Sequence, residues 1–487
     1  MSDFNWKPVG LELAYKILNK AEGKLLVYFD PDVDGLFSGY LACRVLDALG
    51  KPYDKYINPN RAHGFFMSEQ EIAALSGRTV IAVDFSITKD KLSLLYKHNV
   101  RLINIDHHDI REKNLVYWGT VDNPDGVVIN NQYCFEPAEH RYLSGAGCVF
   151  YTFANMFEWF DTSLTRALVG ITLLSDIRPI ENDYAKVFLS ACYTSRDPYM
   201  LYLVKVTKAD RDFSFGVPLM ERNYIDFTFS PKMNALFRMN RGYDAIDLLF
   251  GTASDLDLDA IRQEQNAIRD DILGRLSPVY TSSSFDLLFS PEFEVSPDFA
   301  ITNFIGLTCS KIKGDSNKST IAYMGTGSHI TRGSFRGRYD NVDYLSLFQR
   351  YGFSCAGHAN AFGISDCDTS NIDISALDSE LKALEQQASL IQMKNRLIPV
   401  ENMSLFIHTD LLKQVAMSNN YVRDQNRIYL KYTGTAISHV KHGKMIEYTL
   451  DNIKVKCFDE ALSPTSDYIL PIYDRRALSF YLKPAQT

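Results

Sequence analysis

Four short segments between residues 30 and 179 are rich in aspartate and histidine. They read DPDVDG (30–35), VDFS (83–86), IDHHD (105–109) and LLSDIRP (173–179). Carboxylates and imidazoles are the ligands with which proteins hold hard and borderline divalent cations. Two such cations close together can supply a nucleophilic water, offset the charge of a phosphate and stabilise a leaving oxygen. The residue types therefore favour metal-assisted cleavage of a phosphodiester.

The same residues also have a purely structural interpretation. A single aspartate after a strand is more often a helix cap than a ligand, and histidines can be satisfied within a core. Each segment alone is weak, but all four in this order favour one common site. The candidate metal ligands and catalytic residues are Asp30, Asp32, Asp34, Asp84, Asp106, His107, His108 and Asp176.

Three predicted strands carry the first acids. The segments KLLVYFD (24–30), TVIAVDF (79–85) and VRLINID (100–106) are apolar, and each has an aspartate at or near its end. Amphipathic stretches at 36–50 and 68–77 lie between them. Alternating strands and helices predict a parallel sheet with helices on its faces. Because ligands bind beyond the carboxyl ends of such strands, we expect the acids to converge on one edge.

The rest of the chain indicates further domains, since 487 residues exceed what one core usually organises. Helical patterns fill 141–210 and 256–276, strand and helix patterns run from 285 to 366, and a polar helix is predicted at 374–392. Strand patterns follow at 427–437, 445–450 and 453–458. We therefore predict an α/β protein in four parts: a parallel-sheet catalytic domain (1–250), a long connecting helix (251–280), a smaller α/β domain (281–372), and a helix with a β-rich region (373–487).

Composition limits the possible partners and compartments. The net charge is −8, so binding to nucleic acid would need a local basic cleft, helped by cations that offset the clustered carboxylates. The eight cysteines show neither CxxC pairs nor a disulfide framework, which is typical of reduced, buried residues. No signal peptide and no apolar run long enough for a membrane span is evident. We expect a cytoplasmic protein.

The order DxDxDG, VD, DHH and a lone aspartate in LxSDxxP resembles the DHH (Asp-His-His) phosphoesterase superfamily. Further stretches resemble its RecJ branch, and the last of them is similar to the signature of the associated DHHA1 domain. These stretches are INPNRAHGFFMSEQEI (57–72), VDNPDG (121–126), LSGAGCVFY (143–151), SDIRPIENDYAK (175–186), SPKMNALFRMN (230–240) and AGHANAFG (356–363). The resemblance covers residues 24–366.

This resemblance implies roles for the candidate residues and two bound ions, Mn²⁺ or Mg²⁺. Asp32 and Asp34 would bind one metal each, with Asp84 as the bridge. His107 and Asp176 would complete the second metal's ligands, and His108 would face the scissile phosphate or help the first metal. Asp106 would orient an imidazole. Asp30 is ambiguous: related phosphatases have a histidine ligand where this chain has Tyr28, so Asp30 or water would serve instead.

Substrate-binding residues are implied in both α/β domains. The segment from Lys311 to Arg338 is basic, and the resemblance places Arg336 with Gly357 and His358 as a phosphate grip. Arg61, Asn234 and Arg238 would guide a strand. The other interpretation is that the basic segment is a solvated face and that the separate residues form surface ion pairs. The C-terminal β-rich region would be an oligonucleotide-binding (OB-like) barrel, or equally a dimerisation or capping sheet.

The resemblance implies a RecJ-like 5′→3′ exonuclease that acts on single-stranded nucleic acid, with DNA favoured, and that has a single-strand-binding or repair protein as a partner. One alternative is a nanoRNase or cyclic-dinucleotide phosphodiesterase of the same superfamily. Another is an inactive replication or repair scaffold, against which the intact acid and histidine set argues.

Overall fold

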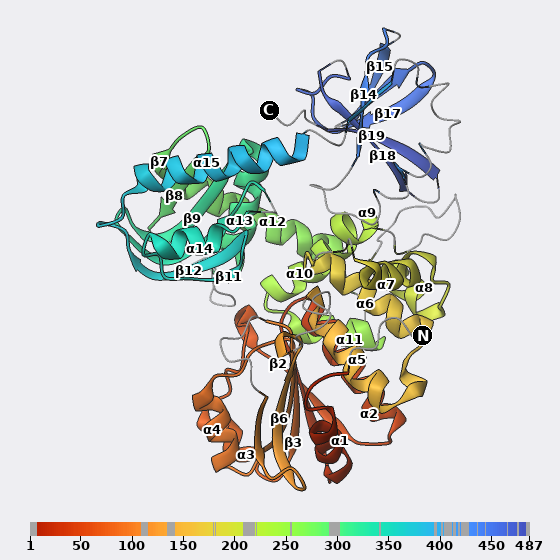
Figure 1. The fold of residues 1–487 in the computed structure, drawn as a ribbon, viewed down its shortest axis with the longest axis vertical. Coiled ribbons are helices and arrows are strands. Elements are labelled where there is room, and N and C mark those ends of the chain that lie inside the picture. The colour runs from red at the N-terminus through yellow and green to blue at the C-terminus, as the bar shows by residue number, and fades with distance from the viewer. Residues whose placement is uncertain are drawn as a thin grey trace. The chain divides into compact units, whose positions relative to one another are not determined.

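The computed structural model describes most of the chain as two compact units, Met1–Arg262 and Gln263–Thr487 (Figure 1). The described residues are 7–108, 115–133, 142–178, 180, 182–207, 220, 222–253, 256–291, 302–339, 342–393, 397–400, 403, 412, 415–416, 419, 428–435, 437–443, 445–464, 466–474 and 477–483. Each unit is described by itself below.

The N-terminal unit is built on a six-stranded sheet with the order β2-β1-β3-β4-β6-β5. All neighbouring pairs are parallel except β5–β6, so the predicted parallel sheet is confirmed. Every residue of β1 and β3 is buried, as expected for parallel strands that are covered on both faces. The strands are β1 (Leu25–Phe29), β2 (Tyr53–Ile57), β3 (Thr79–Val83), β4 (Arg101–Asp106), β5 (Val116–Gly119) and β6 (Pro124–Asn130).

Helices cover both faces of this sheet (Figure 1). On one face Ile72 of α3 and Leu95 of α4 join a core with Val80 and Leu102 of the sheet. On the other face α5 contacts both α1 and α2, and these three helices contact strands β6, β1 and β4. The helices are α1 (Leu11–Lys20), α2 (Val33–Ala48), α3 (Glu69–Ala74), α4 (Lys89–Lys97), α5 (Gly145–Met156), α6 (Ser163–Ser175), α7 (Asp183–Thr194), α8 (Pro198–Thr207), α9 (Arg222–Tyr224), α10 (Ser230–Arg238) and α11 (Gly242–Phe250), with single turns η1 (Pro59–Arg61), η2 (Asn131–Tyr133), η4 (Glu158–Phe160) and η5 (Ile225–Phe229).

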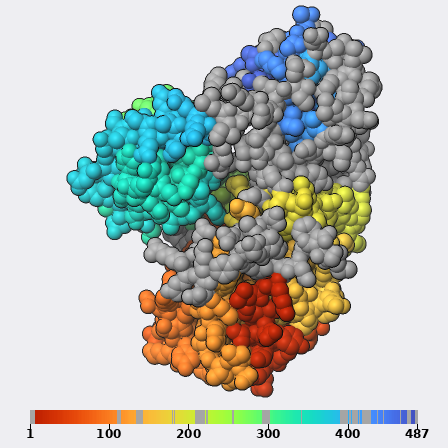
Figure 2. Space-filling model, viewed as in Figure 1, coloured from red at the N-terminus to blue at the C-terminus, as the bar shows by residue number. Residues whose placement is uncertain are grey.

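Helix α12 (Leu258–Arg275) precedes a second six-stranded sheet with the order β11-β12-β10-β9-β8-β7. Only β8 and β9 pair in parallel there. Leu347 of α14 and Leu377 of α15 belong to the same buried core, and the space-filling view shows this part of the chain as one packed body (Figure 2). The elements are β7 (Ser277–Thr281), β8 (Phe285–Ser290), α13 (Thr302–Ser316), β9 (Ser319–Thr326), β10 (His329–Arg336), α14 (Tyr344–Arg350), β11 (Cys355–His358), β12 (Ala361–Asp368) and α15 (Ile374–Met393).

The C-terminal region forms a seven-stranded sheet with the order β13-β14-β18-β19-β17-β16-β15. Leu430, Val455 and Leu482 lie in its core. The predicted β-rich region is confirmed, whereas its OB-like character stays a prediction. The strands are β13 (Leu397–Val400), β14 (Tyr429–Tyr432), β15 (Ile437–His442), β16 (Met445–Leu450), β17 (Ile453–Cys457), β18 (Tyr468–Asp474) and β19 (Ala477–Lys483).

Two further findings concern the chain as a whole. No helix within the described residues is both long and apolar enough to span a bilayer. The seven cysteines that lie among the described residues are free, and all of them except Cys355 are buried.

A buried carboxylate ties α15 to the second sheet. Glu385 is 2% exposed, and its Oε1 accepts hydrogen bonds from Ser319 Oγ (2.5 Å) and Tyr344 Oη (3.0 Å). Glu385→Ala should lower the free energy of unfolding by about 1–3 kcal/mol, because two buried hydroxyls lose their acceptor. Glu385→Gln keeps an acceptor oxygen and should cost much less. Urea denaturation of the full chain measures the difference, and equal losses in the two variants would contradict this role.

Candidate metal centre

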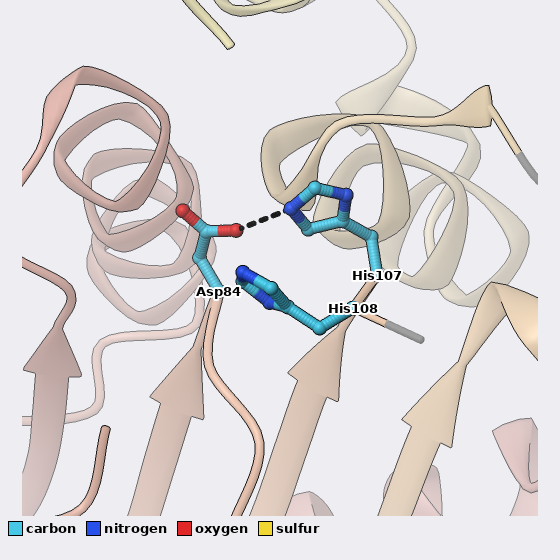
Figure 3. Close-up of side chains that lie close together, drawn as sticks. All are labelled: Asp84, His107 and His108. Atoms are coloured by element: carbon cyan, nitrogen blue, oxygen red, sulfur yellow. Dashed lines mark ion pairs between the residues drawn. The ribbon is translucent and has the colours of Figure 1, made fainter. Parts of the chain in front are cut away.

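The predicted acids and histidines of the N-terminal unit meet beyond the carboxyl ends of its central strands. Asp84 follows β3, and Asp106 is the last residue of β4 with His107 directly after it. The register pairs Val83 with Ile105, so these strand ends lie level. Figure 3 shows Asp84 and His107 reaching toward each other from the two strands. The sheet therefore gathers these side chains by its topology alone.

His107 is the residue around which the other candidates gather. Its Nε2 lies 3.1 Å from Asp84 Oδ1, 3.7 Å from Asp176 Oδ2 and 3.9 Å from Asp34 Oδ2. Two groups of ligand atoms, each within 4.8 Å of one another, share this histidine: Asp84, His107 and His108, and Asp34, His107 and Asp176. Both groups combine carboxylate oxygen with imidazole nitrogen, a donor set that suits Mn²⁺ or Mg²⁺ better than a thiolate-seeking metal.

The N-termini of two helices support the carboxylates. Asp34 accepts hydrogen bonds from the backbone N–H groups of Gly145 (2.6 Å) and Ala146 (2.9 Å) in the first turn of α5. Asp32 caps α2 by accepting from Gly35 N at 2.9 Å, so it is a helix cap as well as a candidate ligand. Exposed backbone N–H groups and the helix dipole both favour negative charge at these positions.

Glycine is required at the contact between α5 and Asp84. A Cβ atom on Gly145 would lie 2.2 Å from Asp84 Oδ1, which is closer than real contacts allow. Asp84 itself has φ +68°, in the left-handed region that aspartate and asparagine tolerate better than most residues. The carboxylate is therefore held in place from both sides, by its own backbone and by the first turn of α5.

The buried carboxylates of the centre lie close to one another and need compensating positive charge. Burial and the neighbouring Asp176 and Asp32 hold the pKa of Asp34 well above its usual range. Burial and Asp34 do the same to the pKa of Asp84. Arg178 offsets part of this charge, with its Nε 3.8 Å from Asp176 Oδ2. Buried carboxylates that repel one another are stable only when protons or cations neutralise them, and the residues present fit a pair of divalent cations.

Asp106 is directed at His108, not at the carboxylates. Its Oδ1 lies 2.7 Å from His108 Nδ1, and its Oδ2 accepts a hydrogen bond from Ser86 Oγ at 2.7 Å. Burial acts to lower the pKa of His108, but Asp106, together with Asp30 and Asp176, outweighs burial and raises this pKa to about 10. Burial likewise raises and His108 lowers the pKa of Asp106, with a net decrease. Asp106 therefore fixes the orientation of the His108 ring, whose side chain is 44% exposed.

A second carboxylate–histidine contact lies beside the centre and was not predicted as such. His63 Nδ1 is 2.5 Å from Asp30 Oδ2, and Asp30, Asp32 and His63 form a third group of ligand atoms within 4.8 Å. The sequence signal was the histidine in INPNRAHGFF, between the first two acidic segments. Tyr28 instead points away into the core, where its hydroxyl donates to Asn58.

The predicted strand-guiding residues of this unit lie on two elements in contact. Arg61 ends η1, two residues before His63. Burial and the positive charge of Arg61 act to lower the pKa of that histidine, but Asp30 contributes to a net rise. Asn234 and Arg238 are four residues apart on α10 and so face the same side of it. Helix α10 contacts η1.

Arg336, Gly357 and His358 lie in the second unit. Arg336 and His358 both pair with Ala361, from opposite sides. The side chains of Arg336, Ala361 and His358 therefore point to the same face of the sheet. Gly357 has φ +143°, and a Cβ there would lie 2.8 Å from Phe362 Cα. A glycine therefore fits this strand where a larger residue would not.

The basic segment around Arg336 is partly neutralised within its own domain. Lys311 pairs with Asp315 (2.5 Å) and Lys318 with Asp286 (3.1 Å). The guanidinium of Arg336 donates to neutral groups: Ser310 Oγ at 3.2 Å, Ser334 Oγ at 2.8 Å and Phe335 O at 2.7 Å. Burial lowers the pKa of Arg336. Of the three cations, Arg336 is the best placed to attract an anion.

Both the sequence and the fold are similar to those of known proteins. Residues 24–175 match the model of the DHH family, N-terminal domain. No curated protein matches the sequence. The fold is similar to RecJ from Thermus thermophilus in complex with Mn²⁺, with a TM-score of 0.66 and 17% identity over 99% of this chain and 72% of that chain.

Two further solved structures have a fold similar to that of this chain. The Mg²⁺ complex of the Thermus thermophilus RecJ has a TM-score of 0.60 and 14% identity over 99% of this chain and 70% of that chain. An exonuclease RecJ bound to manganese has a TM-score of 0.53 and 18% identity over 78% of this chain and 94% of that chain. Residues 24–175 thus match the DHH family, N-terminal domain, and the fold of the chain is similar to that of RecJ.

Proposed function

We propose that this protein is a metal-dependent exonuclease that degrades single-stranded nucleic acid, with DNA favoured and with 5′→3′ polarity. The observation that carries the proposal is the pair of ligand groups sharing His107 at the carboxyl edge of a parallel sheet. A purely structural role does not explain this cluster, because buried carboxylates that repel one another destabilise a fold.

Two divalent cations, Mn²⁺ or Mg²⁺, fit the donor atoms of the centre. Solved structures of RecJ with either ion support this choice. Asp34, His107 and Asp176 would hold one cation, Asp32 would hold the other with Asp30 beside it, and Asp84 would bridge them. When bound, such cations activate water and offset charge on a phosphate. The protein itself supplies a water-poor, fixed arrangement of ligands.

His108 and Asp106 would act on the substrate. Asp106 accepts from His108 Nδ1 and so fixes both the orientation of the ring and its charge. Since the His108 side chain is 44% exposed, its opposite edge can meet an oxygen of the scissile phosphate. An imidazolium there stabilises negative charge as the bond breaks and can hand a proton to the leaving oxygen.

The second unit would grip a phosphate of the substrate. Arg336 brings a partly buried positive charge whose hydrogen bonds go to neutral acceptors, and the small Ala361 separates it from His358 on the same face. A guanidinium binds phosphate through two parallel hydrogen bonds. Arg61, Asn234 and Arg238 would contact the strand in the N-terminal unit.

The test of the centre is Asp84→Asn, which keeps a side chain compatible with φ +68°. Without the bridging charge, cleavage in Mn²⁺ should fall by on the order of a thousandfold. The metal-free variant should melt higher than the metal-free wild type, by about 2–4 °C for each kcal/mol of repulsion removed.

The pH dependence follows from the raised pKa of Asp84. A carboxyl group whose pKa is raised by folding contributes stability at low pH that is lost as pH rises through the folded-state pKa. In Asp84→Asn the free energy of unfolding should therefore decrease less as pH rises over this range, because residue 84 no longer titrates. Asp183→Asn, at an 82% exposed side chain on α7, is the charge-matched control. Near-normal cleavage by Asp84→Asn in Mn²⁺ would exclude the assignment.

Neutralising Arg336 tests the phosphate grip. Arg336→Ala should weaken binding of a labelled single strand, measured with Ca²⁺ in place of Mn²⁺ to suppress cleavage. The slope of log K against log salt should fall by about one unit, because one phosphate contact is lost. Lys311→Ala is the matched control, since Lys311 is already paired with Asp315. Identical affinity and slope in the two variants would mean that Arg336 does not contact the substrate.

The substrate class is tested with end-labelled strands of DNA and RNA, tagged separately at each end, and with a cyclic dinucleotide. A long DNA strand should be degraded from its 5′ end much faster than the dinucleotide is hydrolysed, and duplex DNA should resist. Comparable turnover of dinucleotide and long strand would instead favour the small-substrate phosphodiesterase.

A further inference from the structure

We infer that His63 is a metal ligand, which completes with Asp30 and Asp32 the position of the cation that Asp32 would hold. The inference extends the proposed function, because it assumes that the centre takes divalent cations. It adds an imidazole from the loop between β2 and α3, an element that contributes none of the four acidic segments.

Three ligand atoms meet at this position. Those of Asp30, Asp32 and His63 lie within 4.8 Å of one another, and the group shares no residue with the two groups around His107. Asp30 is 2% exposed, whereas the His63 side chain is 46% exposed. The site is thus open on the side of the imidazole, where water or a substrate oxygen can fill further coordination positions.

The loop holds His63 between two fixed peptide groups. Asn58 is 3% exposed, and its Nδ2 donates to Ala62 O and to Gly64 O, both at 2.6 Å. The carbonyls before and after His63 are therefore bound by one buried side chain. Gly64 has φ +118°, a conformation that suits glycine, and its N–H lies 3.4 Å from Asp30 Oδ1. A ligand fixed in this way loses little entropy when a cation binds.

Tyr28 anchors the same loop from β1. Its hydroxyl donates to Asn58 Oδ1 and accepts from Phe66 N at 3.1 Å. The side chain lies in the core against Tyr56, Phe65 and Phe85. Tyr28 thereby positions the loop that brings an imidazole to Asp30.

The competing explanation is a simple ion pair between Asp30 and a protonated His63. The two explanations predict opposite signs for one measurement. If His63 is only a cationic partner, its removal leaves Asp30 more negative and Mn²⁺ should bind more tightly. If His63 is a ligand, its removal takes away a donor atom and Mn²⁺ should bind more weakly.

The experiment is a titration of the full chain with Mn²⁺ alone, in which the EPR signal of the free ion reports occupancy. Wild type should take up two ions. His63→Ala should weaken one of the two affinities by about tenfold or more and leave the other unchanged. His98→Ala is the matched control, because His98 also contacts a carboxylate (Glu69 Oε1, 3.0 Å) but lies outside the centre. It should bind Mn²⁺ as wild type does.

Two further variants separate ligation from positioning. His63→Gln has no imidazole nitrogen, so the ¹⁴N modulation of bound Mn²⁺ in pulsed EPR should decrease whether or not the glutamine oxygen binds. Tyr28→Phe keeps every ligand but loses the loop's anchor, so it should weaken the same affinity by a smaller factor. Circular dichroism verifies that each variant is folded.

The Mn²⁺ titration distinguishes a failure of the proposed function from a failure of the assignment of His63. If wild type binds no Mn²⁺, the proposed function is wrong. If wild type binds two ions and His63→Ala binds them equally or more tightly, or if the ¹⁴N modulation is unchanged in His63→Gln, His63 is not a ligand and the proposed function stands.

Discussion

Mutual repulsion among buried carboxylates is the interaction on which the N-terminal unit depends. The sheet forces these groups together, because its five parallel strands end at the same edge. The surrounding structure compensates part of this negative charge. The backbone N–H groups at the starts of α2 and α5 and the guanidinium of Arg178 supply positive charge, and glycine leaves space where a carboxylate must approach closely. The charge that remains uncompensated would favour the binding of cations.

Imidazoles accompany the carboxylates in three different ways. His107 lies among Asp34, Asp84 and Asp176 and belongs to both central groups. Asp106 orients the His108 ring through a contact at its Nδ1, and His63 contacts Asp30 at the side of the centre. The second unit instead has an excess of positive charge at one position, where the partly buried guanidinium of Arg336 lies among neutral partners. One unit therefore has an excess of buried carboxylates, and the other has a partly buried cation.

The sequence predicted those parts of the fold whose pattern is local. β1, β3 and β4 are continuous apolar runs with aspartates at their ends, so the sheet and its edge followed from periodicity. Strand β2 was missed because YDKYI is polar and half-buried. The partners of Tyr28 and His63 could not be predicted either, because a hydrogen bond between residues 30 or 33 positions apart has no signature in the spacing of residue types. Likewise, the pairing of Lys318 with Asp286 became visible only in three dimensions.

The order of the strands has a consequence for how the chain folds. Neighbours β1 and β3 are separated in the sequence by β2, α2 and α3, and each parallel pair requires a crossover. Such long-range pairing forms slowly, because loop entropy is lost before any contact rewards it. The acids therefore stay dispersed along the chain until these long-range pairs align the strand ends. A divalent cation that bound the aligned acids would offset their repulsion, and it would thereby favour the folded unit as well as serve the proposed chemistry.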